Sequence, residues 1–299
     1  MIDLVRAAPH IAHHRGQTFV IKLGGEPLAQ RVRRQELARQ ISAVHALGSR
    51  LVLVHGGGPQ TDSMQRVLGE EPRLIGGKRV TTPLALRALC MATAGELHGE
   101  LLADLTAAGV PAAGLAGASA GLLVARKRPP VETEAGTVDF GAVGDPVAVD
   151  PVPLRALLDA GRLPVVSPPA SDGLGGLLNV NADFMAAAIA SALGAAKLVL
   201  VTGAPGILTN PEDPRSLVSA LSLAELAELE GSGRVRGGMK AKSTAIRRAL
   251  DGGVGRVHVV SGLDPGALLI ELYTNHGAGT LVTRERELVP EEEPVESHA

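Results

Sequence analysis

The chain runs through Phe19-Val20-Ile21-Lys22-Leu23-Gly24-Gly25, a strand-like apolar stretch that ends in a lysine and a glycine turn. Further along, Leu51-Val52-Leu53-Val54-His55-Gly56-Gly57-Gly58 follows the same plan without the lysine. Glycines allow the backbone to approach a ligand closely and to turn its N–H groups toward negative oxygens. A lysine at such a turn neutralises charge on phosphate groups. Although a lysine at a strand end can simply be solvated, the two turns together predict a sheet edge that holds an anion from two sides.

Composition excludes several classes of protein. The chain has 299 residues, and 29 Lys and Arg nearly balance 31 Asp and Glu, so no global field draws it to nucleic acid or anionic lipid. Three Phe, one Tyr and no Trp argue against base stacking. The single cysteine, Cys90, excludes an internal disulfide, and no His or Cys cluster has the spacing of a metal site. Neither a membrane span nor the apolar core of a secretion signal is present, so we expect a cytoplasmic protein.

Strand and helix patterns alternate along most of the chain, which predicts an α/β fold with a mainly parallel sheet and helices on both faces. Strands are expected at 18–23, 51–55, 163–167, 197–201 and 256–260. Helices are expected at 1–16, 35–47, 59–68, 83–108, 151–160, 181–193, 222–230 and 238–251, with His13 and His14 on an exposed helix face. Residues 110–150 predict short antiparallel strands, the turn at 170–178 a boundary between two lobes, and the charged residues 284–299 a disordered tail.

Three other stretches carry polar side chains that suit a ligand site. Asn179-Val180-Asn181-Ala182-Asp183 precedes an Ala-rich helix; a helix cap accounts for one of its polar residues but not for three. Gly237-Gly238-Met239-Lys240-Ala241-Lys242 opens a later helix, where the two lysines point in different directions, so that one can face a cleft. Arg79 has the planar fork that clamps a carboxylate. Solvated lysines and a solvated loop arginine are the alternatives.

In this order, the motifs Lys-x-Gly-Gly, His-Gly-Gly-Gly, Arg-Val-Thr, Asn-Val-Asn-Ala-Asp and Gly-Gly-Met-x-x-Lys resemble those of the amino-acid kinase family, and within it the acetylglutamate kinases. The resemblance covers about residues 3–283. It implies a three-layer αβα sandwich, with N-acetyl-L-glutamate bound by an N-terminal lobe at 18–175 and ATP with Mg²⁺ by a C-terminal lobe at 176–283. The implied reaction transfers the γ-phosphoryl group to the side-chain carboxylate of the substrate, as arginine biosynthesis requires.

The same resemblance implies a role for each matching residue. Lys22 and Lys242 would stabilise the transferring phosphoryl group from opposite sides, and Asp183 would hold both lysines in place. The glycine turns would donate backbone N–H groups. Substrate contacts would fall on Gly57, Gly58, Arg79 and Asn179. Nucleotide contacts would fall on Gly24, Gly25, Thr202, Gly206, Gly238 and Met239.

A second site is implied near the N-terminus. Residues 4–18 are similar to the N-terminal helix that interlaces dimers into hexamers in arginine-sensitive acetylglutamate kinases, which implies an oligomerisation helix at 1–17 and a homo-oligomer, either dimer or hexamer. His258, Glu271 and Gly277 resemble the arginine-sensing site of those enzymes. L-arginine is therefore an expected feedback inhibitor.

The chain also departs from the family pattern. Gly203 stands where the kinases usually have an acidic residue, and Gly95-Glu96-Leu97-His98-Gly99 replaces Gly-Lys-Val-Asn-Lys. Residues 14–26 are also similar to the kinase-like domain of N-acetylglutamate synthase. Two other functions therefore stay open: a non-catalytic, arginine-binding regulatory module, and a kinase for a carrier-linked aminoadipate. The complete set of lysines, glycines and Asp183 favours catalysis over the first, and the N-terminal helix favours the arginine pathway over the second.

Overall fold

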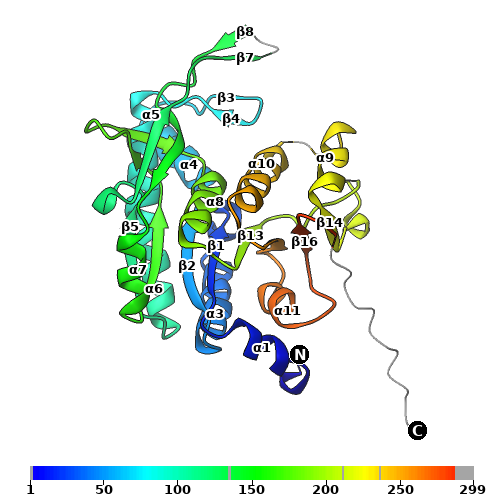
Figure 1. The fold of residues 1–299 in the computed structure, drawn as a ribbon. Helices are drawn as coiled ribbons and strands as arrows, with labels where there is room; N and C mark the ends of the chain where they lie inside the picture. The colour runs from blue at the N-terminus through cyan, green and yellow to red at the C-terminus, as the bar shows by residue number, and fades with distance from the viewer. Residues whose placement is uncertain (1–2, 134–135, 211, 236, 287–299) are drawn as a thin grey trace.

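An eight-stranded sheet forms the centre of the molecule (Figure 1). The computed structural model describes residues 3–133, 136–210, 212–235 and 237–286. The strand order is β14 (Ala220–Ser222), β16 (Thr280–Thr283), β15 (Arg256–Ser261), β13 (Lys197–Thr202), β1 (Thr18–Leu23), β2 (Arg50–His55), β10 (Leu163–Ser167) and β5 (Ala112–Ala116). Neighbouring strands are parallel except β15 and β16. The predicted, mainly parallel sheet is therefore confirmed.

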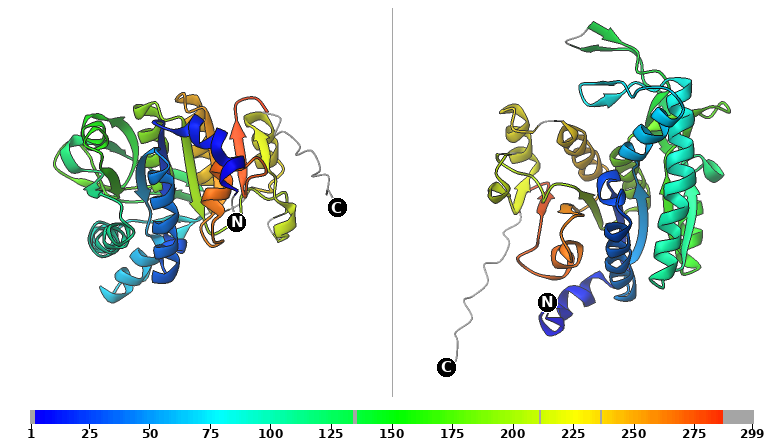
Figure 2. Two further views of the ribbon diagram at one scale, coloured as in Figure 1. Left: turned by 90° about the horizontal axis from the view of Figure 1, so that it is seen from below. Right: turned by 180° about the vertical axis from the view of Figure 1, so that it is seen from behind.

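Helices cover both faces of the sheet, as Figures 1 and 2 show, which gives the expected three-layer αβα sandwich. Alternate residues of a strand point to opposite faces. Phe19, Ile21 and Leu23 pack into a core with α3 (Arg31–Ala46), α6 (Leu97–Ala107) and α11 (Ala267–Tyr273). Val20 packs into the other core, with α7 (Val152–Asp159), α8 (Ala182–Leu193) and α10 (Gly238–Asp251). Since Lys22 has the parity of Val20, its side chain points toward the layer that contains α8 and α10.

The helix predicted across 83–108 is divided in the structure. It consists of α5 (Pro83–Leu89), a π-helical segment (Cys90–Glu96) and α6. The Thr93 hydroxyl lies within hydrogen-bond distance of both the Leu89 carbonyl (2.7 Å) and the Pro168 carbonyl (2.9 Å). A threonine hydroxyl that bonds back to the preceding turn competes with regular helix hydrogen bonds, and π-helical turns are frequent at functional sites.

The prediction of antiparallel strands between 110 and 150 is correct in part. β6 (Leu123–Lys127) pairs antiparallel with β9 (Val143–Val149), and β7 (Val131–Thr133) pairs with β8 (Gly136–Val138). β11 (Ala170–Ser171) and β12 (Leu177–Val180) complete a small barrel with β6 and β9. β5, by contrast, joins the edge of the main sheet in parallel with β10. The hairpin of β3 (Leu74–Ile75) and β4 (Lys78–Arg79) projects beside β7–β8 from one end of the molecule (Figures 1 and 2).

The remaining helices are α1 (Leu4–His14), α2 (Gly25–Leu28), α4 (Gly58–Val67) and α9 (Leu223–Gly231). The sequence patterns did not predict α2, α11 or the strands β11, β12, β14 and β16, all of which are short. Residues 287–299 of the predicted tail lie outside the described residues. Within the described part of the chain, no helix has both the length and the apolar character needed to span a membrane.

Candidate active site

Two lysines and an aspartate meet at the carboxyl end of β1. The Lys22 ammonium lies 2.8 Å from Oδ1 of Asp183, and the Lys242 ammonium lies 3.4 Å from Oδ2. The structure thus brings together three residues that lie far apart in the sequence. Lys22 and Asp183 are only 6% and 5% exposed. One carboxylate between two ammonium groups leaves one net positive charge, which suits an anionic ligand.

The local structure explains why these three side chains converge. Asn181 caps α8 by accepting hydrogen bonds from the N–H groups of Asp183 (2.8 Å) and Phe184 (3.3 Å). Because Asn181 caps the helix, the Asp183 carboxylate is not needed as a cap and can bind the lysines. α10 packs along α8 and points Lys242 at the same carboxylate, whereas Lys240 is exposed. Of the two lysines in this motif, Lys242 is the one that enters the site.

Burial and charge oppose each other in this group. Burial alone would raise the pKa of Asp183, but the ammonium groups of Lys22 and Lys242 outweigh it and hold the pKa below its usual value. Burial lowers the pKa of Lys242, and Lys22 adds to the effect while Asp183 opposes it. Asp183 is therefore ionised at neutral pH.

The two glycine turns predicted to form an anion site lie against each other. A Cβ on Gly25 would lie 2.9 Å from Cδ of Pro59 and 3.0 Å from the backbone nitrogen of Gly58. Gly25 begins α2 and Gly58 begins α4, and the first N–H groups of a helix have no partner within it. The N–H of Gly24 instead donates to the carbonyl of Val201 (2.9 Å). Among the N–H groups that were expected to bind an anion, those of Gly25 and Gly58 therefore suit the role, whereas that of Gly24 does not.

Two buried histidines, His55 and His98, lie next to the glycine turn at 56–58. Nε2 of His55 is 3.0 Å from Nδ1 of His98, and the rings stack with centroids 5.2 Å apart. Nδ1 of His55 is 2.9 Å from the Gly56 carbonyl. Burial lowers the pKa of His55 to about 4 and lowers that of His98 as well. Both rings are therefore neutral at pH 7, and His98, one of the departures from the family pattern, is in contact with the glycine turn's histidine.

Arg79 already binds a carboxylate within the protein. Its guanidinium forms an ion pair with Asp62, and it donates to Oε1 of Gln65 (3.2 Å) and to the carbonyl of Gly58 (3.3 Å). The alternative of a solvated loop arginine is therefore wrong. Asn179 donates to the hydroxyl of Thr81 at 3.0 Å, so it is tied to the segment that carries Arg79.

The predicted nucleotide residues lie in three places, of which the first is the turn of Gly24 and Gly25 at the start of α2. Thr202 ends β13 and Gly206 lies in the loop that follows, where a Cβ would be 2.6 Å from Leu217 and 2.7 Å from the Thr280 hydroxyl. Gly238 and Met239 begin α10, and Met239 packs against the core. Within the described residues, no three His, Cys, Asp or Glu side chains are grouped so that they could hold a metal ion.

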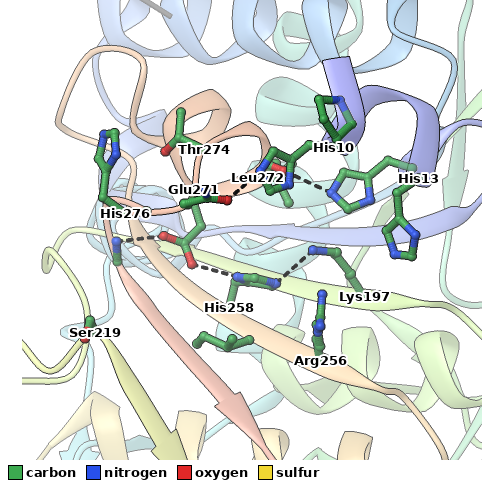
Figure 3. Close-up of a pocket in the computed structure, with 16 residues that line it drawn as sticks. His10, His13, Lys197, Ser219, Arg256, His258, Glu271, Leu272, Thr274 and His276 are labelled. Atoms are coloured by element: carbon green, nitrogen blue, oxygen red, sulfur yellow. Dashed lines mark hydrogen bonds and ion pairs between the residues drawn. The ribbon is translucent and has the colours of Figure 1, made fainter. Parts of the chain in front are cut away.

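A second site lies at the amino-terminal ends of β13 and β15, at the opposite edge of the sheet from Lys22, where α1 meets α11 (Figure 3). Its cavity has a volume of about 410 Å³. Nδ1 of His258 is 2.6 Å from Oε1 of Glu271, and the N–H groups of Ala278 and Gly279 each donate to Oε2 at 2.8 Å. A Cβ on Gly277 would lie 2.8 Å from the same oxygen. The three residues predicted for arginine binding therefore do come together.

Charged neighbours complete this cavity. Burial lowers the pKa of His258 despite the opposing effect of Glu271. Burial would raise the pKa of Glu271, but the hydrogen bond from His258 and the two backbone amides lower it overall. The lining also includes Lys197 and Arg256, the first residues of β13 and β15, which sequence reasoning missed. A basic residue at the start of a buried strand was the available signal.

The placement predicted for one histidine of α1 is wrong. His13 is exposed as predicted, but His14 is buried, and its Nε2 lies 3.0 Å from the carbonyl of Leu272 on α11. Burial, together with the charge of Lys197, lowers the pKa of His14 to about 3. The helical pattern alone did not reveal that α11 packs against this face.

Comparison with known proteins places the chain among relatives of one kind. Residues 17–261 match the model of the Amino acid kinase family. The chain is 47% identical over 293 residues to the acetylglutamate kinase of Myxococcus xanthus, which covers 96% of this chain and 95% of that protein. It is 38% identical over 282 residues to the acetylglutamate kinase of Archaeoglobus fulgidus, covering 93% of this chain and 97% of that protein.

Solved structures agree with that placement. N-acetylglutamate synthase from Neisseria gonorrhoeae, complexed with coenzyme A and N-acetyl-glutamate, matches with a TM-score of 0.82 and 31% identity over 94% of this chain. The match covers 63% of the synthase, so the chain spans less than two thirds of its length. The same synthase complexed with coenzyme A and L-arginine matches with a TM-score of 0.79 and 29% identity, over 94% of this chain and 65% of the synthase. Carbamate kinase from Giardia lamblia matches with a TM-score of 0.65 but 17% identity, over 90% of this chain and 99% of that one, which shows the fold alone.

Proposed function

The chain belongs to the amino acid kinase family, and we propose that it is an ATP-dependent kinase that phosphorylates the side-chain carboxylate of N-acetyl-L-glutamate in arginine biosynthesis. The observation that carries this proposal is the buried group of Lys22, Asp183 and Lys242 beside two glycine turns. Relatives named acetylglutamate kinase that match nearly the whole chain support the choice of substrate.

The geometry fits phosphoryl transfer, in which positioning and charge neutralisation supply most of the catalysis. The negative charge on the transferred group is spread over its three outer oxygens. Lys22 from β1 and Lys242 from α10 approach from different elements, and we propose that they neutralise this charge from two sides. Asp183 holds both ammonium groups in place, and backbone N–H groups of Gly25 and Gly58 add donors. No covalent enzyme intermediate is needed.

We propose that the substrate lies beside the second glycine turn. Arg79 would bind its α-carboxylate, and Asn179 its acetamido group, since both lie on elements next to Thr81. The ion pair between Arg79 and Asp62 supports this role, because it keeps the guanidinium aimed at the carbonyl of Gly58. The lobes at 18–175 and 176–283 would hold substrate and nucleotide, respectively.

ATP would bind on the C-terminal side, along Thr202, Gly206, Gly238 and Met239. We expect Mg²⁺ to accompany it, where the ion would neutralise charge on the β- and γ-phosphates. Because the described residues contain no three-ligand metal group, phosphate oxygens and waters would supply most of the ligands.

ATP turnover with N-acetyl-L-glutamate, glutamate and N-acetyl-aminoadipate, offered in parallel, tests the proposal. We expect turnover with N-acetyl-L-glutamate at the highest kcat/KM. A preference for the aminoadipate derivative would assign the carrier-linked alternative instead. Absence of turnover with all three, in protein that still binds L-arginine, would identify a regulatory module.

We also propose that L-arginine inhibits the enzyme from the cavity beneath α1. Glu271 offers a carboxylate for a guanidinium, and the cavity contains basic groups suited to an α-carboxylate. Turnover measured with rising L-arginine tests this; activity unaffected at millimolar arginine would contradict it. A cytoplasmic location, assembly through the helix at 1–17, and a dimer or hexamer are further proposals, the last testable by light scattering.

A further inference from the structure

The short helix α2 lies on the carboxyl ends of β13 and β15. The N–H of Gly24, just before α2, donates to the carbonyl of Val201 in β13. A Cβ on Gly262, just after β15, would lie 2.8 Å from two carbons of the Pro27 ring. These close contacts fix the backbone of α2, and with it the stem of Glu26.

Glu26 fills the volume that a side chain at position 203 would need. A Cβ on Gly203 would lie 2.6 Å from the carboxyl carbon of Glu26, and closer still to one of its oxygens. Glu26 is exposed, and its carboxylate has no hydrogen bond or ion pair within the described part of the chain. The loop that it touches, 202–206, is the one proposed to bind the nucleotide.

The other carboxylates of the site are already neutralised. Asp183 binds Lys22 and Lys242, and Asp62 binds Arg79. An unpaired carboxylate beside a phosphate site repels the ligand unless a cation lies between the two. Mg²⁺ that is bound by nucleotide phosphates usually takes one or two protein carboxylates as well. Glu26 is a carboxylate at this edge whose charge is available for that purpose, and it lies against the loop at 202–206.

We propose that Glu26 binds the Mg²⁺ ion of MgATP, and that Gly203 is small in order to leave room for it. This inference rests on the proposed kinase function. It also accounts for a departure from the family pattern: the acidic side chain usually found at position 203 is absent, and a carboxylate from α2 occupies its place.

Glu26→Gln removes the charge and keeps the shape. We measure the Kd of ATP by calorimetry, with Mg²⁺ and, separately, with EDTA and no Mg²⁺. If Glu26 binds the ion, the Kd of MgATP rises about 10-fold or more, while that of free ATP is unchanged or falls because a repulsion is lost. Equal weakening of both forms would indicate a structural role and overturn the proposal, as would no change in either. Glu228→Gln, the same charge change on exposed α9, is the control and should leave both values unchanged.

Gly203→Ala tests the same idea without changing any charge. Gly203 does not have a positive φ, so alanine fits the backbone, and the three atoms nearest to the new Cβ all belong to the flexible end of Glu26. We expect unchanged thermal stability and a loss of MgATP preference similar to that of Glu26→Gln, and we expect Gly203→Asp added to Glu26→Gln to restore the preference. Normal MgATP preference in Gly203→Ala, or no recovery in the double variant, would contradict the proposal. If the unmodified protein does not bind MgATP, the kinase function itself fails; if it does and the variants match it, only the role of Glu26 fails.

Discussion

Replacing Asp183 by asparagine should destabilise the protein more than replacing Lys22 by methionine, although both should lower turnover by about 100-fold or more. Asp183→Asn leaves two buried ammonium groups without a counter-charge, whereas Lys22→Met leaves a neutral pair of Asp183 and Lys242. At the observed 2.8 and 3.4 Å, the two attractions are each about 5–6 kcal/mol at an effective dielectric constant of 20, before desolvation is subtracted. Breaking a buried pair costs about 3–5 kcal/mol in net terms, so we expect a loss of that size for Asp183→Asn and about 1 kcal/mol for Lys22→Met.

The loss of stability expected for Asp183→Asn should depend on pH, and the direction follows from the pKa of the buried lysine. Without Asp183, nothing opposes the burial of Lys242 and its repulsion by Lys22, so the pKa of Lys242 falls further below its value in the unfolded chain. The unfolded state then binds more protons than the folded state, so the stability of Asp183→Asn should rise toward that of the unmodified protein as the pH increases from 7 to 9.5.

Urea unfolding followed by far-UV circular dichroism measures these free energies, since the chain has no tryptophan and one tyrosine. Turnover of Lys22→Met should fall about 10²–10³-fold, as expected for a group that stabilises the transition state. An Asp183→Asn protein no less stable than Lys22→Met, or one whose deficit is constant with pH, would refute the charge argument.

Three other predictions concern the second glycine turn, its buried histidine and the cavity at α1. Gly57→Ala places a Cβ 2.6 Å from Cγ2 of Thr93, so it should cost about 1–3 kcal/mol in urea unfolding and raise the KM for N-acetyl-L-glutamate; Gly99→Ala, a helix position with open space around it, is the control and should not destabilise. The pKa of His55 is about 4 in the folded protein against about 6.5 when unfolded, so stability should fall by up to about 3 kcal/mol as the pH drops from 6.5 to 4, and His55→Gln should flatten that slope; equal slopes would contradict the assignment. Glu271→Gln should raise the arginine concentration for half-inhibition about 10-fold or more with unchanged substrate KM values, and unaltered inhibition would remove Glu271 from the arginine site.

Much of the fold could be predicted from local patterns. Alternating apolar strands and amphipathic helices predicted the parallel sheet and its two helical layers. Short elements such as α11 and β16 were missed, because a few residues carry too little periodicity to distinguish them from loops. The burial of His14 was missed for the same reason, since its partner is α11.

By itself, the sequence determined the fold class, the glycine turns and the five ordered motifs that mark the family. Those properties depend on residue type and on spacing along the chain, which the sequence contains directly. The motifs also named Lys242 as the lysine of α10 that reaches Asp183, as the structure has it. Only the tertiary structure decided that Arg79 binds Asp62 and that Glu26 occupies the volume left by Gly203. Glu26 and Gly203 follow β1 and β13 and meet because the sheet places these two strands side by side, and no local pattern specifies such a distance.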